Sequence, residues 1–114
     1  MTTAHRKTRL NSRPAPNRRT LARFRRILRR RLPELQQAYG VQALWLFGSY
    51  VRGKARPRSD LDVLVEFTEA PSLFRYIELE NRLSELVGVK VDLVMKRALK
   101  PNIGVRILAE MVTV

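Results

Sequence analysis

Cysteine is absent from this 114-residue chain, and histidine occurs once. Without cysteine the chain can have no disulfide, no thiol nucleophile and no thiolate metal site, which is compatible with a cytoplasmic protein. No apolar run approaches the roughly 20 residues that a membrane-spanning helix needs. The N-terminal region also lacks the apolar segment and small-residue cleavage site of a secretory signal. We therefore expect one cytoplasmic domain with no membrane contact.

Acidic residues are missing from the first 33 residues, which hold twelve lysines and arginines. The remaining 81 residues hold eleven cations and all ten acids, so the net charge of +13 belongs to an N-terminal appendage. Residues 1–19 have few apolar side chains and two prolines, which predicts a disordered basic arm before a domain over residues 20–114. The default reading of the arm is a solvated tail. Non-specific contact of residues 1–31 with nucleic acid and a partner-docking helix over residues 20–31 are the alternatives.

The apolar pattern beyond the arm predicts helices over 20–39, 49–54, 72–87 and 103–111, and strands over 41–47, 60–67 and 90–95. Thr20 and Ser72 are the expected N-caps, and Pro33 is expected to kink or restart its helix. Trp45 and Phe47 are expected in the core. The predicted inward faces of the last two long helices comprise Leu73, Tyr76, Leu79, Leu83, Leu86, Val87, and Ile103, Ile107, Leu108, Met111. This order predicts an α+β domain with a small mixed β-sheet flanked by helices.

Two aspartates interrupt an apolar strand in "SDLDVLVEF". Alternate strand residues share a face, so Asp60 and Asp62 point the same way, about 6.6 Å apart. Asp92 lies in another apolar strand, "VDLVM", and completes the cluster if the two strands are neighbours. Such carboxylates can flank a pair of divalent cations, and without a cation their charges repel. Oxygen ligands with no histidine or cysteine nearby favour Mg²⁺ or Mn²⁺ over zinc.

Gly48 and Ser49 form a candidate phosphate site where a strand gives way to a helix. Glycine lets the backbone approach a ligand closely, the start of a helix offers free N–H groups, and the serine hydroxyl adds a donor. Arg52 follows directly and is a candidate for binding a triphosphate or pyrophosphate. The three further cations before Asp60 are weaker candidates, and a solvated basic loop is the alternative reading.

The stretch "GSYVRGKARPRSDLD" matches the pattern Gly-Ser-x10-Asp-x-Asp. It resembles the DNA polymerase β-like nucleotidyltransferase superfamily, and "VDLV" looks like that superfamily's third aspartate. Across residues 33–113, "LFGSYVRGKARPRSDLDVLVEF", "PSLFRYIELENRLSELVGVKVDLV" and "LKPNIGVRILAEMV" resemble the minimal nucleotidyltransferases, the antitoxins of HEPN/MNT toxin–antitoxin systems. The resemblance implies the nucleotidyltransferase fold. Val51 replaces the more usual alanine, and the arginine-rich arm is unusual for the family.

The resemblance also implies an activity: transfer of AMP from ATP to a tyrosine of a HEPN-domain toxin, which silences the toxin's RNase. Asp60 and Asp62 would then hold two Mg²⁺ ions, and Asp92 would bind one of them and activate the acceptor hydroxyl. Gly48 and Ser49 would hold the phosphates. The small domain predicts that a partner protein supplies the acceptor. The alternatives are an antitoxin that acts by binding alone, and a nucleotidyltransferase that modifies RNA or a small molecule.

Overall fold

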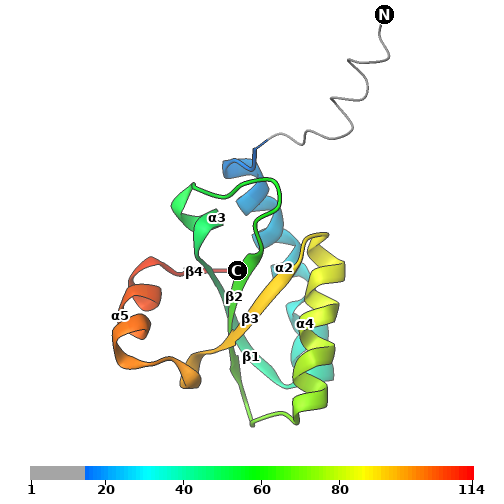
Figure 1. The fold of residues 1–114 in the computed structure, drawn as a ribbon. Helices are drawn as coiled ribbons and strands as arrows, with labels where there is room; N and C mark the ends of the chain where they lie inside the picture. Colours follow the sequence, from blue (N-terminus) through cyan, green and yellow to red (C-terminus); the bar gives the residue numbers. More distant parts are fainter. Residues whose placement is uncertain (1–14) are drawn as a thin grey trace, which may run out of the picture.

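Four strands form one mixed sheet in the computed structural model, which describes residues 15–114 (Figure 1). They are β1 (Val41–Phe47), β2 (Leu61–Phe67), β3 (Val91–Met95) and β4 (Val112–Thr113), in the order β3-β2-β1-β4. Strands β2 and β3 pair in parallel, whereas β1 pairs antiparallel with both β2 and β4. The predicted mixed sheet is confirmed. Strand β4 was not predicted, because two residues are too few to show an alternating pattern.

The helices are α2 (Arg18–Tyr39), α3 (Ser49–Arg52), α4 (Leu73–Val87) and α5 (Pro101–Glu110), with a short 3₁₀ helix η1 (Lys96–Ala98) after β3. Figure 1 shows α2 and α4 on one side of the sheet and α5 on the other. Helix α3 connects β1 to the loop that leads into β2. Over residues 15–114, no helix combines the length and the apolarity that crossing a bilayer requires.

Helix α2 begins earlier than the sequence pattern indicated. Asn17 is the N-cap: its side chain accepts the N–H groups of Arg19 and Thr20, while the Thr20 hydroxyl accepts the Asn17 N–H in return. Thr20 is therefore the third helical residue of a capping box and not the cap itself. Residues 18 and 19, expected to belong to the arm over residues 1–19, are therefore helical. Residues 1–14 of that arm lie outside the described residues. The helix is continuous across Pro33.

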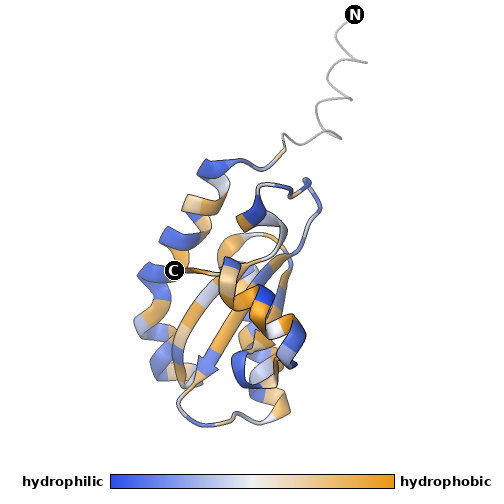
Figure 2. Ribbon diagram, turned by 90° about the vertical axis from the view of Figure 1, so that its left-hand side faces the viewer, coloured by the Kyte–Doolittle hydropathy of each residue, from blue (hydrophilic) through white to orange (hydrophobic). Residues whose placement is uncertain are grey.

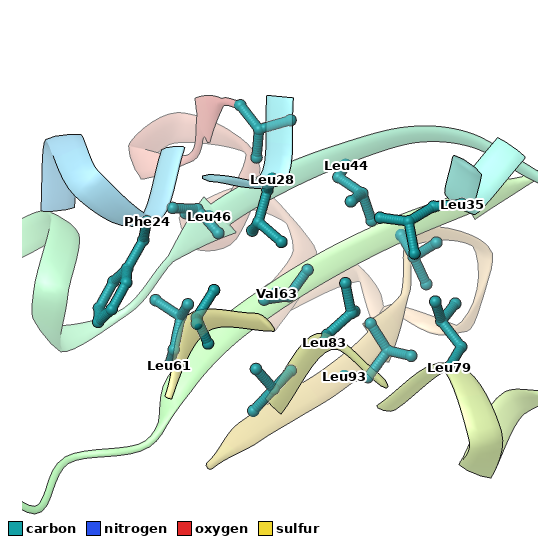
Figure 3. Packing of buried hydrophobic residues seen from close by; sticks show 14 of the residues in the cluster. Phe24, Leu28, Leu35, Leu44, Leu46, Leu61, Val63, Leu79, Leu83 and Leu93 are labelled. Carbon is teal, nitrogen blue, oxygen red and sulfur yellow. The ribbon is translucent and has the colours of Figure 1, made fainter. Parts of the chain in front are cut away.

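The core lies between the sheet and the helix pair α2 and α4, which contact each other. Fully buried side chains from α2, α4, β1 and β2 pack together in this core, as Figure 3 shows: Phe24, Leu28, Leu35, Leu46, Leu61, Val63, Leu79 and Leu83. Burial of apolar surface, which stabilises a fold by about 25 cal/mol per Å², is the main stabilising contribution here. The β2 residues in this set are at alternate positions, so the residues between them point away from the core.

Some predicted core residues lie at the surface. Leu73 begins α4 and is 75% exposed, and Ile103 and Leu108 of α5 are 54% and 45% exposed. Helix α5 has few contacts with the other elements, and Figure 2 shows apolar residues along its ribbon. Trp45 is only partly buried, with the Lys96 ammonium 4.8 Å from its ring centroid. The predicted positions of Leu79, Leu83 and Val87 in the core are confirmed.

Candidate active site

Asp62 and Asp92 are direct neighbours across the parallel pair β2 and β3. The register sets Leu61 opposite Val91, Asp62 opposite Asp92 and Val63 opposite Leu93, so apolar residues on each side of the aspartates enter the core. The aspartates therefore point to the opposite face. The expectation that the third aspartate lies beside the second strand is confirmed. Asp60 lies just before β2, at an exposed position two residues from Asp62.

Gly48 lies against the carboxylate of Asp62. A Cβ atom at residue 48 would be only 1.9 Å from Oδ2 of Asp62, and the backbone has φ 82°, a conformation that side-chain-bearing residues rarely adopt. Phe47 is opposite Asp62 in the β1–β2 pair, which explains this closeness. The Gly-Ser turn and the aspartates thus meet at one edge of the sheet. Since α3 has only four residues, its dipole is small, and the anion donors here are individual groups.

Asp62 has a strongly perturbed acidity. The pKa of Asp62 is raised from 3.8 to about 6, first by partial burial and then by the negative charges of Asp92, Asp60 and Glu110, while the Arg52 guanidinium lowers it. Negative charge therefore accumulates at this edge beyond what the protein neutralises by itself. Perturbed carboxylates in a concave site are typical of catalytic centres and of cation sites.

Glu110, at the end of α5, belongs to the site although it was not among the candidate residues chosen from the sequence. Its Oε2 accepts the Gly48 N–H at 2.7 Å, and both carboxylate oxygens accept from Nη1 of Arg52 at 3.1 and 3.2 Å. Arg52, predicted to bind phosphates, therefore has a carboxylate partner. A usable signal existed: an acid in the last turn of a helix opposes the helix dipole and needs another reason to be there.

Helix α4 fixes the outer edge of β3 beside Asp92. Strand β3 is at the edge of the sheet, so its outward backbone groups have no strand partner. Ser84 Oγ accepts the Val91 N–H at 3.0 Å, and Glu80 Oε2 accepts the Leu93 N–H at 2.9 Å. The Tyr76 hydroxyl donates to the Leu93 carbonyl. These three side chains recur every four residues on α4, a spacing that places them on one helix face.

A pocket of about 220 Å³ opens between the Gly-Ser turn and α5. Its lining residues combine apolar and charged groups: Phe47, Gly48, Arg52, Asp62, Ile103, Arg106, Ile107 and Glu110. Phe47, expected in the core, is buried but faces this pocket. Two arginines with nearby apolar side chains suit a ligand that has both an anionic group and an apolar ring.

Comparisons with known proteins agree with this geometry. The family model described as "Nucleotidyltransferase domain" matches residues 22–114. The chain belongs to the nucleotidyltransferase domain family. It is 48% identical over 95 residues to the protein adenylyltransferase MntA of Thermococcus cleftensis, covering 83% of this chain and 96% of that protein.

Solved structures show the same fold. One, described as a minimal nucleotidyltransferase, superposes with a TM-score of 0.67 at 36% identity, covering 86% of this chain and 96% of the other. Another is the tri-AMPylated HEPN toxin of Shewanella oneidensis in complex with its MNT antitoxin, with a TM-score of 0.57, 20% identity, and coverage of 78% and 70%. The predicted family and α+β fold are confirmed.

The remaining candidates of this nucleotidyltransferase differ in how close they lie to the site. Ser49 is the first residue of α3, directly after Gly48. Ser59 forms a turn before Asp60: its Oγ accepts the Arg56 N–H at 2.8 Å, and its own N–H donates to the Arg56 carbonyl. The Tyr50 hydroxyl donates to the Ser59 carbonyl, which ties this turn to α3. Lys54, Arg56 and Arg58 are absent from the pocket lining.

The aspartates have the donor chemistry for a hard divalent cation, because all three supply carboxylate oxygens. Within residues 15–114 no three acidic or histidine side chains are close enough together to form a ready-made metal site. Asp62 and Asp92 are the adjacent pair, and Asp60 affects the acidity of Asp62 from nearby. The donor set fits Mg²⁺ or Mn²⁺ by its chemistry.

Proposed function

We propose that this nucleotidyltransferase acts in the cytoplasm as an antitoxin, transferring AMP from ATP to a tyrosine hydroxyl of a partner HEPN-domain RNase toxin. The observation that carries the proposal is the meeting of Asp62, Asp92 and the Gly48 backbone at one edge of the sheet. Transfer of a nucleotidyl group requires a cation site directly beside a group that donates a hydrogen bond to the phosphate.

The proposed reaction forms a bond between the acceptor oxygen and the α-phosphorus of ATP. The bond from that phosphorus to the oxygen of the leaving pyrophosphate breaks. Asp92 takes the proton of the acceptor hydroxyl, since it is the more exposed member of the aspartate pair and can face an incoming protein. Gly48, Ser49 and Arg52 bind the phosphates. Two Mg²⁺ ions held by Asp60, Asp62 and Asp92 would neutralise the charge that develops on the phosphate oxygens.

Several findings support an acceptor on a partner protein. The Thermococcus relative carries the name of a protein adenylyltransferase, and the Shewanella structure contains a toxin modified by AMP beside an antitoxin of this fold. Exposed apolar residues of α5, among them Val105 at 69% exposure, lie near the pocket and offer a protein partner a contact surface.

The test is to incubate the full chain with ATP, Mg²⁺ and a HEPN-domain protein as the candidate partner, and to record intact masses. We expect the partner to gain the mass of one or more AMP groups on tyrosine, and Asp60→Ala and Asp62→Ala to abolish the gain. An adduct that survives both changes would refute the assigned roles. Neutralisation of the toxin by Asp62→Asn without any adduct would favour the antitoxin that acts by binding alone, and labelling of RNA would favour an RNA acceptor.

We also propose that the exposed arginines of α2 bind the backbone of nucleic acid. Arg19, Arg23, Arg26 and Arg30 are exposed, and their spacing places them within a sector of about 60° along about 16 Å of helix. None of the four has an ion pair with an acid among residues 15–114. Such a row of guanidinium groups on a rigid helix complements a row of phosphates, without base specificity.

The experiment compares two triple variants that remove equal charge. Arg19, Arg26 and Arg30 become glutamine in one, with Arg23 kept because its guanidinium lies over the Phe24 ring. Lys90, Arg97 and Lys100, exposed elsewhere, become glutamine in the other. With single-stranded RNA, the slope of log affinity against log salt should fall by about 2 in the first variant. Equal slopes in both variants would refute the α2 site. If the α2 variant keeps its RNA binding and loses toxin binding, the arginines bind an acidic protein partner.

A further inference from the structure

Glu110 makes contacts that connect α5 to the Gly-Ser turn. It is the last residue of α5, and its carboxylate reaches the backbone N–H of Gly48 at 2.7 Å in a partly buried environment. The same carboxylate forms an ion pair with Arg52 at 3.1 Å, and the Glu110 side chain is only 24% exposed. One carboxylate thus occupies two of the three groups to which phosphate binding was assigned.

This is an unfavourable place for a negative charge. The C-terminal end of a helix carries partial negative charge, so an acid there is destabilised by the α5 dipole. Asp62 lies nearby and adds like-charge repulsion, which is also one cause of its raised pKa. The Gly48 N–H and the half-exposed Arg52 are the groups that offset this repulsion. A glutamine would fill the same space without the repulsion, so packing alone does not explain the charge.

The Gly48 N–H has one hydrogen, and it cannot be given fully to two acceptors. A phosphate oxygen that binds at this N–H must therefore displace the Glu110 carboxylate, and it must also take Arg52 from it. We propose that Glu110 is an internal competitor for the phosphate of the nucleotide: it holds the donors in the orientation that phosphate needs, and the nucleotide displaces it. The inference rests on the proposed nucleotidyl transfer and names the residue that sets nucleotide affinity.

Displacement has a consequence for which ligands are accepted. The incoming group must outcompete a carboxylate that is already held by a charge-assisted hydrogen bond. A triphosphate with its cation brings several charges and further contacts, whereas a single phosphate offers little more than the carboxylate that it replaces. Glu110 therefore lowers affinity for all anions and discriminates most strongly against small ones, including inorganic phosphate.

The test measures binding of a fluorescent, non-hydrolysable ATP analogue to the full chain with Mg²⁺. Glu110→Gln keeps the shape and removes the charge, and we expect about tenfold tighter binding, with a larger gain for inorganic phosphate. The amide proton of Gly48, followed by NMR, should shift in this variant, and in the unaltered chain it should shift on addition of the analogue. Glu34→Gln is the matched control: its carboxylate also pairs with arginine, Arg82 at 3.0 Å, on the opposite side of the sheet.

Unchanged or weaker binding by a folded Glu110→Gln protein would overturn the inference and identify Glu110 as a structural brace. If that variant does not fold, Glu110→Asp replaces it: the charge stays, the reach is one methylene shorter, and tighter binding is again expected. If the analogue binds and its affinity does not depend on Glu110, this inference is refuted and the proposed function is not. Absence of analogue binding in the unaltered chain and in every variant would remove the proposed function together with it.

Discussion

The two faces of the sheet differ sharply although the same strands form them. On one face Leu61, Val63 and Val65 of β2 are fully buried against α2 and α4. On the other face Asp62, between two of these residues in sequence, is partly exposed beside a pocket. Leu64 is buried on this second face as well and separates Asp62 from Glu66, the next charged residue along the same face. Burial on one face therefore stabilises the fold, and this offsets the destabilising charge of the carboxylates on the other face.

The largest effect should come from removing a carboxylate on the exposed face. Asp62→Asn is expected to lower AMP transfer by more than about a hundredfold. Replacing a residue that only supports a metal ligand already lowers metal affinity or activity by about 10–100-fold. Glu66→Gln, two side chains further along the same face, is the control and should retain activity. Initial rates with the toxin as acceptor measure both. Equal losses in the two variants would mean that the face is not divided in this way.

The buried face should respond in stability. Leu83→Ala, at a fully buried position of α4, is expected to lower the free energy of unfolding by about 3 kcal/mol because it leaves a cavity. Leu73→Ala, on the same helix but 75% exposed, should change it by less than about 0.5 kcal/mol. Urea denaturation of the two variants gives the comparison. Similar midpoints would show that the core does not lie where the structure places it.

Gly48→Ala tests the contact between the two regions. The added methyl group would meet the Asp62 carboxylate, and the positive φ angle adds strain of about 1 kcal/mol. We expect a lower melting temperature and loss of nucleotide binding together, measured by calorimetry and by titration with the ATP analogue. Gly53→Ala is the control, since it also has positive φ but nothing within 4 Å of the added atom. It should lose stability and keep binding.

The smallest effect concerns pH. The pKa of Asp62 is raised to about 6 in the folded protein, so the folded state binds the proton more tightly than the unfolded one. Stability associated with this group is complete below about pH 4 and is lost as pH rises through 6. Asp62→Asn should therefore be more stable than the unaltered chain above pH 6, by about 1 kcal/mol after solvent screening, and not below pH 4. Melting curves without metal test this; a pH-independent difference would contradict it.

Much of the fold followed from local signals. The strand over 41–47 and the helix that Ser72 caps were predicted with the boundaries the structure shows, because apolar runs and capping residues are local features. The start of α2 was placed late, because Asn17 and Thr20 both look like caps and only their mutual hydrogen bonds distinguish them. Strand β4 pairs with residues far away in sequence, and no local pattern reveals it.

The site was predictable in part for the same reason. Asp60, Asp62, Gly48 and Ser49 lie within one short motif, and the apolar context of Asp92 indicated a neighbouring strand. Glu110 is 62 residues from the glycine that it contacts, so its role depends on how α5 lies against the sheet. The residues of α4 that hold β3 depend likewise on tertiary packing. Exposed positions such as Leu73 were misplaced, because helical periodicity shows which residues share a face but not which of them another element covers.

The pairing of Asp62 with Asp92 has a consequence for errors in folding. A slip of β3 by one residue would turn every one of its side chains to the opposite face and bury the Asp92 carboxylate among leucines. Burying an unpaired charge is expensive enough to exclude that register. Packing among core residues that do not contact the substrate thus excludes the wrong register. A chain that folds stably therefore has Asp62 and Asp92 side by side.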